Sequence, residues 1–172
     1  DVAHPLMHEL ALLFNETVCL AVERNFEVVY IDVVQGPGAH TRSEARIGNA
    51  SYMHCTGIGK LLLTNYTETQ LQYFTQHKEL VRHTEKTITT LDGLLEEVEA
   101  VRRLGYAFDN EECEIGGRCI AAPIYDHLGK VAAGISVSGT VFHLNDDMIA
   151  CHKEKFLQTV AEISNKLGYR EQ

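Results

Sequence analysis

Two apolar runs joined by a short turn restrict the fold of this chain more than any other feature. The runs read "GGRCIAAPIY" and "KVAAGISVSG", and the turn "DHLG" at residues 126–129 separates them. Short apolar runs bounded by glycine favour strands. A connection of four residues can join antiparallel strands but is too short for a parallel crossover. Residues 116–139 are therefore predicted to form an antiparallel hairpin.

Polar side chains interrupt this apolar hairpin. If Tyr125 faces Lys130, then Cys119 faces Ser136, and Ser138 lies on the same side of the sheet because alternate residues share a face. A hydroxyl buried without a partner costs about 1–3 kcal/mol. Either a small polar ligand or water supplies the partners in a pocket, or the serines bond backbone carbonyls and the cysteine is a small core residue.

The remaining pattern places helices around strands without a repeated βαβ unit. This order is typical of an α+β fold in which helices flank an antiparallel sheet. We find no internal repeat and no linker, so residues 1–172 are expected to form a single domain. The expected elements are a helix over 1–14, a hairpin reversing at Arg24–Asn25, a candidate edge strand and loop over 40–52, helices over about 57–64, from 67 and over 91–104, a strand over 106–109, and a helix from Asn145 to before Gly168.

A glycine-rich turn, "HCTGIGKLLL", opens the second expected helix. Thr56 is a candidate N-cap, and Gly57 lets a ligand approach the backbone. The first N–H groups of a helix can hold a carboxylate. The same pattern also describes an ordinary capped helix, and it lacks the spacing of a phosphate-binding loop.

Charge and cysteine content narrow the classes of partner. Fifteen basic and 24 acidic residues give a net charge of −9, a poor match to nucleic acid or to an anionic membrane. The five cysteines are irregularly spaced and predict no disulfide framework, which favours a reducing cytoplasm. No apolar run reaches the 18 residues of a membrane span, and we expect no membrane contact.

Three rival functions are weaker. An enzyme could use Cys119 as its nucleophile, but no neighbouring histidine or lysine in the sequence lowers the pKa of this thiol. A dimerisation module with a filled core would bind no ligand. A metal site would need histidine and cysteine ligands, but the candidate ligands have neither the HxxxH nor the CxxC spacing of common metal motifs. We therefore expect no metal and no cofactor. The candidate ligands for that rival are His54, Cys55, His77 and His83, or Cys151 with His152.

Three stretches in order carry a family resemblance: "HCTGIGKLLL", "GLLEEVEAVRRLGYAFDNEE" and "RCIAAPIYDHLGKVAAGISVSG". Over about residues 1–170 the chain resembles the effector-binding domain of the IclR family of bacterial transcriptional regulators. The resemblance implies a GAF-like fold that binds a small metabolite and sets the DNA affinity of an N-terminal winged helix-turn-helix. We expect that DNA-binding domain to be missing here, because "DVAHPLMHELALLF" begins abruptly in a helical pattern.

The resemblance also implies the residues of the effector site. They are Thr56, Gly57, Ile58, Asp109, Cys119, Ser136 and Ser138. The expected effector is a small carboxylic acid, a 2-oxo acid or a sugar acid, and Asp109 favours an acid that carries a hydroxyl. "TITTLDGLL" is similar to members that govern sugar-acid catabolism. Many relatives have serine or alanine at Cys55 and Thr56, which leaves the identity of the acid open.

Partners follow from the same resemblance. The whole protein is expected to be a repressor of carbon-catabolism genes that contacts DNA only through the missing domain. This domain should also associate with itself as a homodimer or tetramer, because such regulators read two half-sites. The strand "FEVVYIDVVQG" and the first helix are the candidate contact surfaces.

Overall fold

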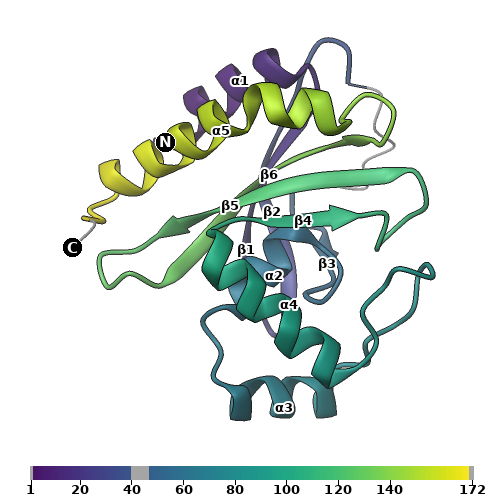
Figure 1. Ribbon diagram of the computed structural model, residues 1–172. Coiled ribbons are helices and arrows are strands. Elements are labelled where there is room, and N and C mark those ends of the chain that lie inside the picture. The colour runs from purple at the N-terminus through teal and green to yellow at the C-terminus, as the bar shows by residue number, and fades with distance from the viewer. Residues whose placement is uncertain (1, 40–46, 171–172) are drawn as a thin grey trace.

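A six-stranded antiparallel sheet with helices on both faces forms the protein, as the computed structural model of residues 2–39 and 47–170 shows (Figure 1). The strand order is β3-β2-β1-β6-β5-β4. This arrangement confirms the predicted α+β class. The helices are α1 (Ala3–Phe14), α2 (Gly57–Leu63), α3 (Glu68–His77), α4 (Leu91–Leu104) and α5 (Asp146–Lys166), and the strands are β1 (Thr17–Arg24), β2 (Glu27–Gln35), β3 (Ala50–Ser51), β4 (Ala107–Asn110), β5 (Gly117–Tyr125) and β6 (Val131–Thr140).

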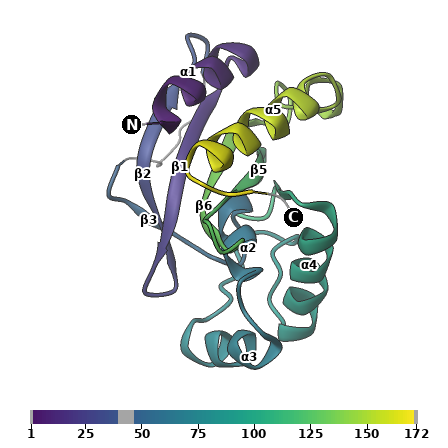
Figure 2. The same ribbon diagram turned by 90° about the vertical axis from the view of Figure 1, so that its left-hand side faces the viewer.

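Helices α1 and α5 cover one face of the sheet, and α2 and α4 cover the other, with α3 against α4 (Figure 2). Local capping starts three helices where the sequence predicts. Thr56 accepts a hydrogen bond from the Gly59 N–H, Asn145 accepts one from the Met148 N–H, and Thr67 forms a capping box. The edge strand predicted within 40–52 is β3, and residues 40–46 lie outside the described residues.

Alternation along the strands divides the apolar side chains between two cores. Val18 and Leu20 of β1 face α1 and α5, and Val22 packs against the same cluster, as their spacing predicts. Ala21 of β1 and Ala121 of β5 face α2 and α4 in the second cluster. The face that carries Ala121 also carries Cys119, so the thiol lies on the α2 side of the sheet.

The register of the central hairpin differs from the predicted one by two residues. Cys119 faces Ser138 rather than Ser136, and Ser136 faces Ala121. The cause is a loop one residue longer than expected, followed by an irregularity next to Tyr125, which pairs with Val131. A shift of two residues keeps every side chain on the same face of the sheet. Cys119, Ser136 and Ser138 therefore still lie on one side, as predicted.

One further expectation needs correction. Leu91, Leu94, Leu95, Val98, Val101 and Leu104 recur at helical spacing, which predicts one buried stripe on the helix over 91–104, but the Leu104 side chain is 57% exposed. Leu104 is the last residue of α4, and Gly105 ends the helix there with a φ of 78°. Within the described residues, no helix is long and apolar enough to span a bilayer.

Candidate functional site

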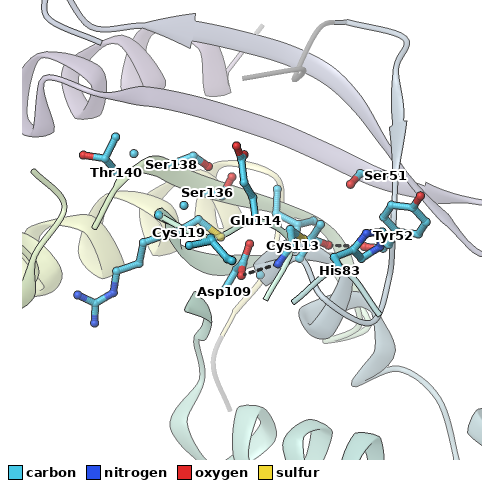
Figure 3. A pocket seen from close by; sticks show the side chains of 18 of the residues that line it. Ser51, Tyr52, His83, Asp109, Cys113, Glu114, Cys119, Ser136, Ser138 and Thr140 are labelled. Atoms are coloured by element: carbon cyan, nitrogen blue, oxygen red, sulfur yellow. Dashed lines mark hydrogen bonds between the residues drawn. The ribbon is translucent and has the colours of Figure 1, made fainter. Parts of the chain in front are cut away.

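A cavity of about 920 Å³ opens between the start of α2, the α2-facing side of the sheet and the loop that follows β4 (Figure 3). Its volume lies within the range of small-molecule sites. All seven residues predicted for an effector site line this cavity: Thr56, Gly57, Ile58, Asp109, Cys119, Ser136 and Ser138. Segments far apart in the sequence therefore meet in one place.

The start of α2 forms one wall of the cavity, and its first residues have structural tasks of their own. The Thr56 hydroxyl accepts from the Gly59 N–H at 3.0 Å and donates to the Tyr52 carbonyl at 2.5 Å. A Cβ at Gly57 would lie 2.9 Å from Ala121 Cβ and 3.0 Å from Cys119 Sγ. Glycine at this position thus lets α2 approach the sheet, and its expected role in letting a ligand approach the backbone stays a prediction.

The Cys119 thiol lies at the centre of the cavity wall. Burial and the nearby Asp109 carboxylate raise its pKa to about 12, although the backbone N–H of Gly57 also reaches the sulfur and opposes this shift. A thiol with that pKa stays protonated at neutral pH, so it is a poor nucleophile. This protonation state does not favour Cys119 as the nucleophile of an enzyme.

The two serines of β6 differ in their neighbours. Ser136 is 5% exposed and its hydroxyl bonds the thiol of Cys19, which faces it across the β1–β6 pairing. Ser138 faces Thr17 on β1 and Cys119 on β5. Sequence reasoning missed Cys19 because nothing local indicates that β1 pairs with β6. Ser138 is the more accessible of the two hydroxyls for a ligand.

Asp109 combines a turn role with a place in the cavity wall. Its Oδ1 accepts from the Glu112 N–H at 2.9 Å and from the Cys113 N–H at 3.4 Å, a pattern that is typical of aspartate in turns. Burial raises the pKa of this carboxyl to about 6, with a smaller contribution from the Glu112 carboxylate. Asp109 is therefore largely ionised at pH 7.5 and largely neutral at pH 5.

The raised pKa of Asp109 predicts a pH-dependent stability difference. Between its unfolded value near 3.8 and its folded value of about 6, the folded state binds the proton more tightly, so stability falls as pH rises through this window. Asp109→Asn keeps the accepting oxygen and removes the charge. The variant is expected to be more stable than wild type by about 1–3 kcal/mol at pH 7.5, and the gain should vanish below about pH 4.

Urea unfolding at several pH values, in chelator-containing buffer, measures this difference. Asp126→Asn is the matched control, because hydrogen bonds from the Lys130 and Leu128 N–H groups lower the pKa of the Asp126 carboxyl. That variant should be less stable than wild type at neutral pH and should converge with it in acid. A gain for Asp109→Asn that does not change with pH would contradict the assignment.

Aromatic, histidine and cysteine side chains gather at the other end of the cavity. The rings of Tyr52 and His83 lie beside each other with centroids 4.5 Å apart, and Cys113 lines the same cavity (Figure 3). Single ligand atoms of His54, Cys55 and His83 lie within 4.8 Å of one another. Their sequence spacing fits no metal motif, so only the folded loops reveal the cluster.

His77, Cys151 and His152, the other candidate metal ligands that the sequence offers, lie outside this cluster. His77 stacks on Tyr73, and its Nδ1 lies 2.8 Å from the Tyr73 carbonyl. Cys151 is exposed on α5, and His152 packs edge-on against Phe14.

Lys60 of α2 is a buried cation that sequence reasoning missed. Its ammonium contacts Glu112 at 2.7 Å, Glu97 at 3.0 Å and the Phe108 carbonyl at 2.8 Å. Burial lowers its pKa, but the attraction of the two carboxylates outweighs this and the net direction is upward. The lysine stays charged and ties α2 to α4, to β4 and to the loop that follows β4. Its one signal in the sequence is a charge inside the apolar run "GIGKLLL".

Comparison with known proteins assigns this geometry to a family. Residues 1–165 match the family model described as bacterial transcriptional regulator IclR C-terminal. The chain is 37% identical over 170 residues to the HTH-type transcriptional repressor AllR of Salmonella paratyphi A. The match covers 99% of this chain and 62% of the relative, so the chain spans about three-fifths of the length of that protein.

Solved structures agree in fold. The Thermotoga maritima IclR crystal structure superposes with a TM-score of 0.90 at 37% identity, covering 98% of this chain and 68% of that one. The inducer-binding domain of a double mutant of the PobR transcription factor from Acinetobacter, solved with 3-hydroxybenzoic acid, superposes with a TM-score of 0.83 at 26% identity. That match covers 97% of this chain and 95% of the other.

Proposed function

Because the chain belongs to the IclR family of bacterial transcriptional regulators, we propose that it is the single effector-sensing domain of a transcriptional repressor. The repressor assignment rests on the name of the Salmonella relative. The chain covers 62% of that HTH-type protein, which supports a separate DNA-binding domain that precedes residues 1–172. A regulator of this kind acts in the cytoplasm.

The effector that fits this cavity is a small carboxylic acid. The observation that carries this assignment is the convergence of seven predicted residues on one cavity of about 920 Å³. The Acinetobacter domain in complex with 3-hydroxybenzoic acid, a hydroxylated carboxylic acid, supports the ligand class. A five-atom acid cannot exceed about 7.5 kcal/mol, or a low micromolar dissociation constant. The cavity has room for a larger sugar acid.

Each polar group has a defined role in this proposal. The ligand carboxylate lies between the Ser138 hydroxyl and the first N–H groups of α2 at Gly57 and Ile58. The N–H of Gly57 is shared with the Cys119 sulfur, so Ile58 and Ser138 provide the stronger contacts. Asp109 accepts from a ligand hydroxyl through the oxygen that does not cap its turn.

A thermal-shift screen of the chain tests the proposal. The panel contains pyruvate, glyoxylate, gluconate and 3-hydroxybenzoate, each paired with its amide or alcohol analogue. An effector at 100 times its dissociation constant is expected to add about 2.7 kcal/mol of stability, whereas the analogue without a carboxylate should add little. Equal shifts from acid and analogue would refute recognition of the carboxylate, and no shift from any acid would favour the rival dimerisation module, which binds no ligand.

Ser138→Ala separates specific from general binding of the acid found in that screen. The variant removes the hydroxyl that we place on the carboxylate and adds no atom to the cavity wall. Loss of a hydrogen bond to a charged group costs about 1.5–3 kcal/mol, so the dissociation constant should rise about 10- to 150-fold in calorimetry. Thr75→Val on α3 removes a hydroxyl outside the cavity lining and should leave affinity unchanged.

Effector binding would change the DNA affinity of the preceding domain. A coupling of about 1–3 kcal/mol between the two sites changes DNA affinity about 5- to 150-fold, which suffices for a metabolite sensor. Self-association would place copies on two half-sites. Leu12 of α1 and Ile31 of β2 are exposed apolar side chains on the two elements proposed for that contact.

A further inference from the structure

Three nitrogen and sulfur donors lie together at the Tyr52 end of the effector cavity, and a fourth donor lies beside one of them. His54, Cys55 and His83 each offer a ligand atom, and these atoms lie within 4.8 Å of one another. A second thiol, Cys113 Sγ, lies 2.9 Å from Cys55 Sγ. Two imidazoles and two thiols are the donor set of structural zinc sites.

His54 is oriented as metal-bound histidines usually are. Its Nε2 lies 2.9 Å from the Val81 carbonyl, which can only accept, so Nε2 carries the hydrogen and Nδ1 keeps a lone pair. Ligating histidines commonly donate their other ring N–H to a backbone carbonyl.

His83 supplies a second, independent observation. Its Nε2 is buried and has no hydrogen-bond partner among the described residues. A buried polar atom without a partner costs about 1–3 kcal/mol, so native structures seldom leave one without a purpose. The ring of His83 stacks near that of His54, with centroids 6.1 Å apart, and Cys55 completes the group. A metal ion would satisfy the free nitrogen.

We propose that His54, Cys55, His83 and Cys113 form a Zn²⁺ site at this end of the cavity. Binding converts both thiols to thiolates and releases two protons, so two negative charges balance the ion. The ion would join three loops, which lead to α2, precede α4 and follow β4. Because His83 and Cys113 also line the cavity, zinc would rigidify the wall of the effector site.

Zinc titration of the untagged 172-residue chain, stripped by chelator and kept reduced, tests this site without any effector. We expect one equivalent of Zn²⁺ in competition with a chromophoric chelator, and an increase in the melting temperature. Cobalt substituted for zinc should give a tetrahedral visible spectrum and a thiolate charge-transfer band. His83→Gln and Cys55→Ser should each weaken binding at least 10-fold, and Cys113→Ser should reduce the charge-transfer band by about half.

His77→Gln and Cys151→Ser are matched controls, because they remove the same donor types outside the cluster. Both should bind zinc as wild type does. Circular dichroism of every metal-free variant checks that the fold is intact. Zinc binding that survives both His83→Gln and Cys55→Ser, or that His77→Gln abolishes, would overturn the site. A cobalt spectrum that Cys113→Ser leaves unchanged would overturn the fourth ligand.

Discussion

Replacing Lys60 by methionine is expected to destabilise the fold by about 3–5 kcal/mol, the cost of leaving a buried charge without its partner. The lysine side chain is 1% exposed, and its partner Glu112 is 10% exposed, so water cannot replace the lost ammonium. Glu97 is 34% exposed and can regain hydration. In a chain of this size the loss corresponds to a fall in melting temperature of about 6–20 °C.

Urea unfolding of Lys60→Met, Glu112→Gln and the double variant measures the pairing directly. The double variant should be more stable than the sum of the single losses predicts, because it removes both members of the buried pair. Lys78→Met is the matched control. Its salt bridge to Glu27 is at the surface, where such pairs contribute about 0.2–1 kcal/mol. Equal losses for Lys60→Met and Lys78→Met would refute a buried role.

Gly59→Ala is expected to destabilise the chain by about 1–3 kcal/mol, opposite in sign to the effect of alanine in an ordinary helix. Alanine gains about 0.8–1 kcal/mol over glycine in a helix interior. Here, however, a Cβ would lie 2.5 Å from Met53 Cα and 2.6 Å from Thr56 Oγ1, and closer still to the Met53 carbonyl oxygen. Backbone atoms cannot move away cheaply, so the start of α2 must shift.

The same shift predicts a functional loss. Thr56 Oγ1 caps α2 through the Gly59 N–H, so displacement of Gly59 disturbs the wall where we place the effector carboxylate. Acid affinity should therefore fall together with stability, as calorimetry and urea unfolding can show. Gly117→Ala is the control, because its nearest new contact is an ordinary 3.5 Å and its stability should change by less than about 0.5 kcal/mol. A Gly59→Ala variant that is more stable than wild type would contradict the packing argument.

Most of the helices and strands could be predicted from the sequence. Thr67 and Gln70 form the capping box that their spacing indicates, and β1 and β2 reverse at Asn25, as expected. The face of the hairpin was also predictable, since an error of two residues returns each side chain to the same side. The register itself was not, because the loop length that sets it depends on a local irregularity beside Tyr125.

The seven expected site residues came from family resemblance together with the hairpin pattern, and the structure places all of them around one cavity. Their roles in binding stay predictions. The buried Lys60 and the Cys19–Ser136 contact were beyond sequence reasoning, and the sequence offered His54, Cys55 and His83 only as candidate ligands of a weaker alternative that also included His77. Each joins residues more than 25 positions apart, and no local motif marks such a pairing.

The sequence alone determined where helices and strands begin and which side chains point to the same side of each, since capping and alternation act over a few residues. Only the tertiary structure decided which strands are neighbours, which charge is buried and which donors meet. Those outcomes depend on packing free energy summed over the whole chain: β1 lies beside β6 because both apolar faces are buried there, and Ser136 thereby meets Cys19.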